Sequence, residues 1–187
     1  MSDKLKRQQL NNQGFSLVEL IVIMIIVVIL ATAVVVAFVN SEDQKTKSSA
    51  TLVSKYLDNV MNYSMTKGNA YLTLEYDDDS GRYYVKDSEN HSEKLSPAIE
   101  VSYHIENSEN ENVIAIDEEN DKLMLSFSRT NGSFTPIIKS VNADGTFVYE
   151  TTGDSNSNVY VDKIYIKCND STKVIHLYTK TGVYEIE

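Results

Sequence analysis

A long apolar run near the N-terminus limits what this chain can fold into. Residues 20–39 contain one polar side chain, Thr32, and twenty helical residues span about 30 Å, the thickness of a bilayer's hydrocarbon core. One carboxylate, Glu19, lies at the edge of the run, although a charge at the centre of a membrane helix costs roughly 2.5–3.5 kcal/mol. We therefore predict a transmembrane helix over residues 15–39 and a partner charge for Glu19.

The segment before the run is mostly polar and ends in Gly14. It contains Lys4, Lys6 and Arg7, and basic residues beside a membrane helix favour the cytoplasmic side. The C-terminal part of the chain should then lie outside the cell. Gly14 has no Cβ, so another backbone can approach it closely, as in a peptidase site.

The sequence Gly14-Phe15-Ser16-Leu17-Val18-Glu19-Leu20 resembles the leader junction of type IV pilins and type II secretion pseudopilins. The resemblance implies that residues 1–14 are a leader removed by prepilin peptidase, which also methylates the new amine of Phe15. It also implies that Glu19 acts in assembly, where it would meet the Phe15 amine of a neighbouring subunit. Gly14 and Phe15 are thus the expected processing residues, and Phe15 and Glu19 the expected assembly residues.

The resemblance implies a structural, minor subunit of a type IV pilus-like or pseudopilus filament. The expected partners are other pilin or pseudopilin subunits, prepilin peptidase, membrane lipid and the inner-membrane assembly platform. The chain would be a single-pass plasma-membrane protein with its head outside, and would then enter an extracellular filament. The alternative is a membrane-anchored extracellular protein that binds DNA, a substrate or a surface and enters no filament.

Two simpler interpretations of the N-terminus compete with a prepilin leader. Ala31-Thr32-Ala33 has the small-residue pattern of a secretory cleavage site, but residues 34–39 are all apolar and would make an insoluble new N-terminus. An uncleaved signal anchor fits the apolar run but leaves Glu19 unexplained.

Residues 40–68 predict an amphipathic continuation of the helix. Gly68 predicts its end, and Ser41-Glu42-Asp43-Gln44 has the pattern of a capping box that would mark a new helix start or a kink. One face of this segment carries the apolar side chains Leu52, Val53, Tyr56, Leu57, Val60, Met61 and Met65.

Residues 69–187 predict a β-rich extracellular head, because apolar and polar side chains alternate in several short runs. Turn residues at 77–81 and 130–133 separate these runs, and Thr181-Gly182 predicts a closing hairpin. The expected fold class is α+β, with a long N-terminal helix packed on an antiparallel head. The apolar positions of four alternating runs are Ile99-Val101-Tyr103-Ile105, Leu123-Leu125-Phe127, Ile164-Ile166-Cys168 and Ile175-Leu177.

The order of these elements resembles the H-type minor pseudopilins and their pilus counterparts. The resemblance rests on a strand directly after the helix, over residues 70–76, and on the segments 127–132 and 179–182. Many pilins close a C-terminal loop with a disulfide, which this chain cannot do because Cys168 is its one cysteine. We predict a buried thiol there.

No catalytic or metal-binding pattern emerges, so we predict no enzyme activity and no cofactor. His91, His104 and His176 are scattered, and we expect them to be solvated. Asp77-Asp78-Asp79 could attract calcium but lacks the D-x-D-x-D-G spacing, which favours a solvated turn. The acidic cluster over residues 117–121 predicts an exposed loop.

The charge balance argues against nucleic acid as a partner. The chain has 17 basic and 27 acidic residues, and loss of the leader would leave 14 and 26. Binding to phosphates depends on Lys and Arg. A local basic patch is the one alternative, and it would contain Lys163, Lys167, Lys173 and Lys180.

Overall fold

The computed structural model describes residues 16–106, 113–117, 122–151 and 157–187, with residues 33–40 described by their helical backbone alone. Gly14, Phe15 and the rest of the predicted leader lie outside the described residues, as do residues 118–121 of the predicted acidic loop. Contacts divide the chain into two compact units, whose boundary falls between Phe38 and Val39. Each unit is described by itself below.

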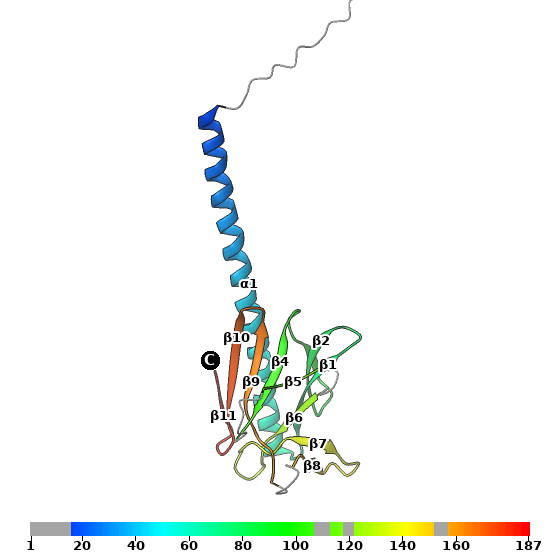
Figure 1. Cartoon of the computed structure of the whole chain (residues 1–187). Helices are drawn as coiled ribbons and strands as arrows, with labels where there is room; N and C mark the ends of the chain where they lie inside the picture. The colour runs from blue at the N-terminus through cyan, green and yellow to red at the C-terminus, as the bar shows by residue number, and fades with distance from the viewer. Residues whose placement is uncertain (1–15, 107–112, 118–121, 152–156) are drawn as a thin grey trace, which may run out of the picture. The chain divides into compact units, whose positions relative to one another are not determined.

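Helix α1, Leu17–Thr66, begins in the first unit and ends in the second (Figure 1). The sequence has no proline or glycine between Phe15 and Lys67 that would interrupt it. The predicted new helix start at Ser41–Gln44 is wrong, because α1 is continuous there. The N–H groups inside a continuous helix are already bonded, so a capping box finds no free donors.

The helix ends where Gly68 was predicted to end it. The N–H groups of Lys67 and Gly68 both donate to the carbonyl of Tyr63, at 2.7 and 3.1 Å. Gly68 has a φ of +78°, the left-handed conformation that a C-terminal cap of this type needs. The chain then turns directly into the first strand, as the sequence predicts.

The second unit confirms the α+β prediction: α1 packs against antiparallel sheets. A four-stranded sheet has the order β3-β2-β1-β6, a five-stranded sheet has the order β11-β10-β9-β4-β5, and β7 pairs with β8. The strands are β1 (Tyr71–Asp77), β2 (Arg82–Asp87), β3 (Ser92–Lys94), β4 (Glu100–Ile105), β5 (Val113–Ala115), β6 (Lys122–Ser126), β7 (Ile138–Val141), β8 (Phe147–Tyr149), β9 (Val161–Cys168), β10 (Ser171–Tyr178) and β11 (Val183–Ile186).

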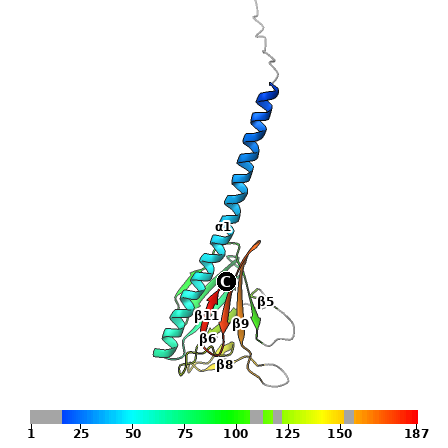
Figure 2. The ribbon, with the colours of Figure 1, turned by 90° about the vertical axis from the view of Figure 1, so that its left-hand side faces the viewer.

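The core of the head lies between the second half of α1 and the two larger sheets, and Figure 2 shows this part of the helix running along the strands. Val53, Leu57 and Val60 are completely buried, as the helical spacing predicts. Met65 was predicted on the same face but is 47% exposed, since it lies in the last turn of the helix. The sheets contribute Leu72, Leu74, Val85, Leu123, Leu125, Ile164, Ile166 and Ile175.

Strand β6 is buried on both faces, although its sequence predicts burial on one. Leu123 and Leu125 face the core as expected, but Met124 and Ser126 are also buried. The segment after β6 folds back beside the end of the strand, because the N–H of Thr135 donates to the carbonyl of Ser126 at 2.9 Å. Alternation in a sequence cannot show which contacts a later part of the chain will add at the polar positions.

Two turns that are far apart in sequence meet at their glycines. Gly132 follows β6, and Gly182 lies between β10 and β11; both have positive φ, at +69° and +71°. A Cβ added to Gly182 would lie 1.8 Å from the carbonyl oxygen of Gly132. The N–H of Phe134 donates to the carbonyl of Thr179 at 3.0 Å beside this contact. Gly182 therefore permits a contact that any side chain at this position would block.

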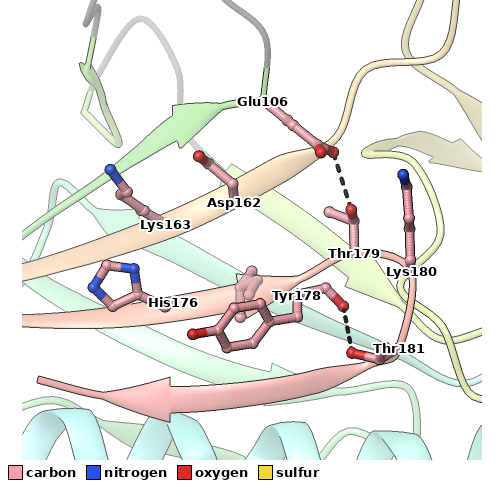
Figure 3. Close-up of a pocket in the computed structure, with 9 residues that line it drawn as sticks. Glu106, Asp162, Lys163, His176, Tyr178, Thr179, Lys180 and Thr181 are labelled. Atoms are coloured by element: carbon pink, nitrogen blue, oxygen red, sulfur yellow. Dashed lines mark hydrogen bonds between the residues drawn. The ribbon is translucent and has the colours of Figure 1, made fainter.

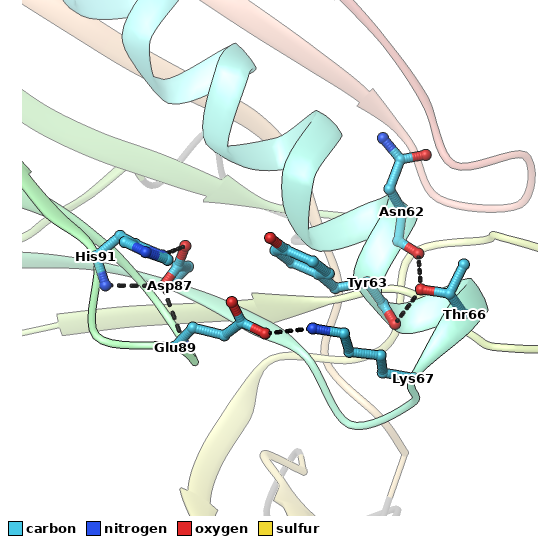
Figure 4. Close-up of polar contacts among 7 residues, drawn as sticks. All are labelled: Asn62, Tyr63, Thr66, Lys67, Asp87, Glu89 and His91. Carbon is cyan, nitrogen blue, oxygen red and sulfur yellow. Dashed lines mark hydrogen bonds and ion pairs between the residues drawn. The ribbon is translucent and has the colours of Figure 1, made fainter.

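Polar contacts in the middle and at the end of the buried segment of α1 tie it to the rest of the head. Tyr184 of β11 donates its hydroxyl to Asp58 at 2.6 Å and to the carbonyl of Ser54 at 3.1 Å. At the end of the helix, Lys67 pairs with Glu89 of the β2–β3 loop at 2.7 Å (Figure 4).

The β2–β3 loop is held by a buried carboxylate. Asp87 accepts the N–H groups of Glu89 and His91 at 3.0 and 2.9 Å, and its other oxygen lies 2.9 Å from Nδ1 of His91 (Figure 4). These donors offset the cost of burying a charge in the head.

Gly182→Ala should destabilise the head much more than Gly145→Ala. Both glycines have positive φ, so each alanine costs roughly 1–2 kcal/mol in backbone strain. At Gly145 the nearest atom to an added Cβ is 3.6 Å away, whereas at Gly182 the Cβ would overlap the Gly132 carbonyl. The clash should lower the free energy of unfolding by about 1–3 kcal/mol more, as measured by denaturant unfolding of the full chain. Equal losses in the two variants would contradict this contact.

Tyr184→Phe should make the head less sensitive to alkaline pH. Burial, and then the hydrogen bond to Asp58, raise the pKa of Tyr184 above its ordinary value of 10.0. Above pH 10 the unfolded chain releases this proton while the folded chain keeps it, so the free energy of unfolding falls as pH rises. The stabilising contribution is fully present below pH 10.

The measurement is the free energy of unfolding as a function of pH between neutral and strongly alkaline conditions. Tyr184→Phe should show a shallower decline than the unmodified chain, with a residual slope because the pKa values of Tyr83 and Tyr103 are also raised by burial. Tyr178→Phe is the matched control, since that ring is 50% exposed on the adjacent strand. The same slope for Tyr184→Phe and the unmodified chain would disprove the assignment.

Candidate functional site

The described part of the first unit begins at the start of α1. The carbonyl of Ser16 accepts the N–H of Leu20 at 3.1 Å, so Ser16 stands at the N-cap position and Glu19 lies in the first helical turn. Ser16 and Glu19 have the spacing of a capping box. The expected processing residues Gly14 and Phe15 directly precede this turn, outside the described residues.

Glu19 is exposed and has no hydrogen bond or ion pair in the part of the chain that the structure describes. A carboxylate in the first turn of a helix gains about 0.3–1 kcal/mol from the helix dipole. This local effect is smaller than the cost of placing the charge in an apolar environment. Glu19 is therefore available to a charge supplied by another chain.

The apolar side chains around Glu19 are exposed on every face of the helix. Thirteen of them, in Leu17, Val18 and the consecutive residues from Leu20 to Leu30, are between 46% and 76% exposed. A helix that is apolar all round has no face suited to water. Among the described residues, no helix was found that is both long enough and apolar enough to cross a membrane.

Covering this surface would release more free energy than Glu19 costs. Full burial of a Val, Leu, Ile or Met side chain is worth about 1.5–3 kcal/mol. About half of each of the thirteen side chains is still exposed, so their burial is worth on the order of 10–20 kcal/mol. A burial cost of roughly 3 kcal/mol for Glu19 does not reverse this balance.

The three histidines each lie beside a carboxylate. The side chain of His91 is 65% exposed, as expected, and His176 lies 3.1 Å from Glu187. The expectation of a solvated ring is wrong for His104, whose side chain is 14% exposed with Nδ1 2.6 Å from Asp162. Strand alternation places His104 on the correct face but cannot show that Asp162 will cover it.

The other predicted candidates behave as structural residues. Cys168 is a buried free thiol, as predicted. The chain turns after Asp77, which accepts the N–H of Gly81 at 2.8 Å and the Ser80 hydroxyl at 2.6 Å. Within the described residues, no three His, Cys, Asp or Glu side chains are grouped to hold a metal ion.

The four lysines of the alternative basic patch do not gather on one surface. Lys163 and Lys167 lie on the face of β9 opposite the buried Ile164 and Ile166, which we call the outer face of the five-stranded sheet. Lys173 pairs in register with Ile166 and therefore lies on the other face. Lys180 is in the β10–β11 turn.

Comparison with known families identifies the N-terminal segment. The family described as the prokaryotic N-terminal methylation motif matches residues 9–35, a range that includes Gly14, Phe15 and Glu19. The chain carries this motif. It is the leader of type IV pilins and pseudopilins, and the match covers the start of α1 but not the head. No curated protein and no solved structure matches the chain, and the H-type resemblance of the head stays a prediction.

Proposed function

We propose that this chain is a structural, minor subunit of a type IV pilus-like or pseudopilus filament. The observation that carries the proposal is the methylation motif at the start of a helix whose apolar side chains are exposed on every face. Such a helix needs either lipid or other copies of the same kind of helix around it. The minor role rests on the H-type order of elements in the head.

Prepilin peptidase would cut between Gly14 and Phe15 and methylate the new amine. Before assembly, the helix over residues 15–39 would lie in the plasma membrane, with the head outside, as Lys4, Lys6 and Arg7 favour. The inner-membrane assembly platform would then move the subunit from lipid into the filament, where helices of other pilins or pseudopilins replace the lipid contacts.

Glu19 would set the register of the incoming subunit. A carboxylate and an amine about 4 Å apart gain roughly 4 kcal/mol at an effective dielectric constant of 20. Desolvation of both charges offsets much of this gain, so the pair specifies position more than it adds stability. Methylation leaves the Phe15 amine charged and preserves the attraction.

The second candidate function is a membrane-anchored extracellular binding protein that enters no filament. It is favoured by two depressions of the head whose linings include charged and hydroxyl side chains and no residue of α1. Leader processing and dependence on Glu19 favour the filament subunit. Full function of an unprocessed monomer favours the binding protein.

Mass spectrometry of the chain from its native membrane and sheared surface fractions tests the processing step. We expect an N-terminal peptide that begins at Phe15 and carries one added methyl group, because the motif places the cut after Gly14. A Gly14 variant with a bulky side chain should keep the leader. A mature chain that retains Met1–Gly14, or that begins after Ala33, would refute prepilin processing.

Glu19→Gln should leave membrane insertion intact and strongly reduce incorporation into filaments. The amide keeps the shape of the side chain but removes the charge that attracts the Phe15 amine. Asp43→Asn is the matched control, because it removes an exposed acidic charge from the same helix outside the matched motif. Membrane extraction and filament shearing measure the two steps. Incorporation of Glu19→Gln at the level of Asp43→Asn would rule out the register role.

A further inference from the structure

A β-bulge in the five-stranded sheet places two consecutive charged side chains in one cavity. His104 of β4 pairs with Lys163 of β9, but the next residue of β4, Ile105, pairs with Val161, so Asp162 is the extra residue. In a regular strand Asp162 and Lys163 would point to opposite faces. Here both line a cavity of about 430 Å³ on the outer face. Bulges redirect side chains in this way and are common next to functional sites.

Two acidic groups of this cavity are held in place by neighbouring side chains. Asp162 lies 2.6 Å from Nδ1 of His104. Glu106 accepts the hydroxyl of Thr179 at 3.0 Å (Figure 3). Each of these contacts uses one carboxylate oxygen, and a carboxylate can accept several hydrogen bonds. The carboxylates are therefore oriented and still able to accept donors from a ligand.

Two basic groups of the cavity have no such partner. Lys163 and Lys180 make no ion pair or hydrogen bond in the part of the chain that the structure describes. Figure 3 shows them at opposite ends of the row of lining side chains, with Asp162, Glu106 and Thr179 between them. A ligand that spans this row would meet donors at both ends and acceptors in the middle.

A second depression of about 720 Å³ lies beside the first. It shares Glu106, Thr179 and Lys180 with the first cavity, and it adds amide and hydroxyl groups from Asn131, Ser133, Asn158 and Tyr160. We call these two neighbouring depressions the bulge groove. Its many uncharged polar groups suit a ligand with several polar groups rather than a single ion.

The acidic and basic side chains that line the groove together favour some classes of ligand over others. A polyanion would be repelled by Asp162 and Glu106, and a polycation by Lys163 and Lys180. A hydroxyl group both donates and accepts, so a ligand with many hydroxyls can satisfy every one of these groups. Tyr178, which is 50% exposed beside them, offers an apolar ring on which the C–H face of a sugar can pack.

We propose that the bulge groove binds a neutral oligosaccharide on the outer face of the head. The sugar hydroxyls donate to Asp162 and Glu106 and accept from Lys163 and Lys180, while a sugar ring packs on Tyr178. This binding does not depend on filament assembly, so it holds or fails separately from the proposed function.

The test uses the full chain, purified in a detergent whose head group is not a sugar. The protein is applied to an array of neutral and acidic glycans, and each glycan that binds is titrated in solution by calorimetry. We expect saturable binding of at least one neutral oligosaccharide. Lys180→Met, which removes a donor shared by both depressions, should weaken that binding roughly tenfold or more, and Tyr178→Ala should also weaken it.

Lys167→Met is the matched control, because Lys167 lies on the outer face of β9 but does not line the groove. It should leave the affinity unchanged. Thermal unfolding of each variant checks that the head is intact. Binding of no glycan on the array, binding of acidic glycans alone, or equal weakening by Lys180→Met and Lys167→Met would each overturn the proposal.

Discussion

The burial of one face of α1 beneath two sheets is the contact on which the head depends. Val53, Leu57 and Val60 have no exposed surface, and both larger sheets contribute to the same core. The second half of the helix thus finds its apolar partners within one chain. The segment from Leu17 to Leu30 is apolar on every face and needs partners that the described chain does not supply. One helix therefore has two requirements, and under the proposed function lipid and other subunits would meet the second.

The features that were correctly predicted from the sequence are those set by local periodicity. The helical spacing of Val53, Leu57 and Val60 identified the buried face of α1, and Gly68 identified its end. Alternation identified β4, β9 and β10, because an inward side chain at every second position is a property of the strand itself. The methylation motif was also predictable, since it consists of a few adjacent residues in a fixed order.

The features that were missed depend on segments that meet only after folding. The segments 127–132 and 179–182 each contain turn residues, but nothing in either sequence shows that Gly132 and Gly182 touch. The bulge at Asp162 shifts the register by one residue, so a strict alternation places Asp162 and Lys163 on opposite faces. His104 was expected in water because alternation places it on the outer face but cannot show that Asp162 will lie against it. Register, unlike periodicity, is decided jointly by two strands.

The lysines of the bulge groove differ from other lysines of the head in what they do for the fold. Lys55, Lys67 and Lys86 each pair with a glutamate from another element. Exposed ion pairs of this kind are worth about 0–1 kcal/mol, so even they contribute little stability. Lys163 and Lys180 lack such partners among the described residues, so neither holds two elements together through its charge. Replacing either lysine should therefore leave the fold intact. A change in the affinity for a ligand can then be attributed to the lost charge.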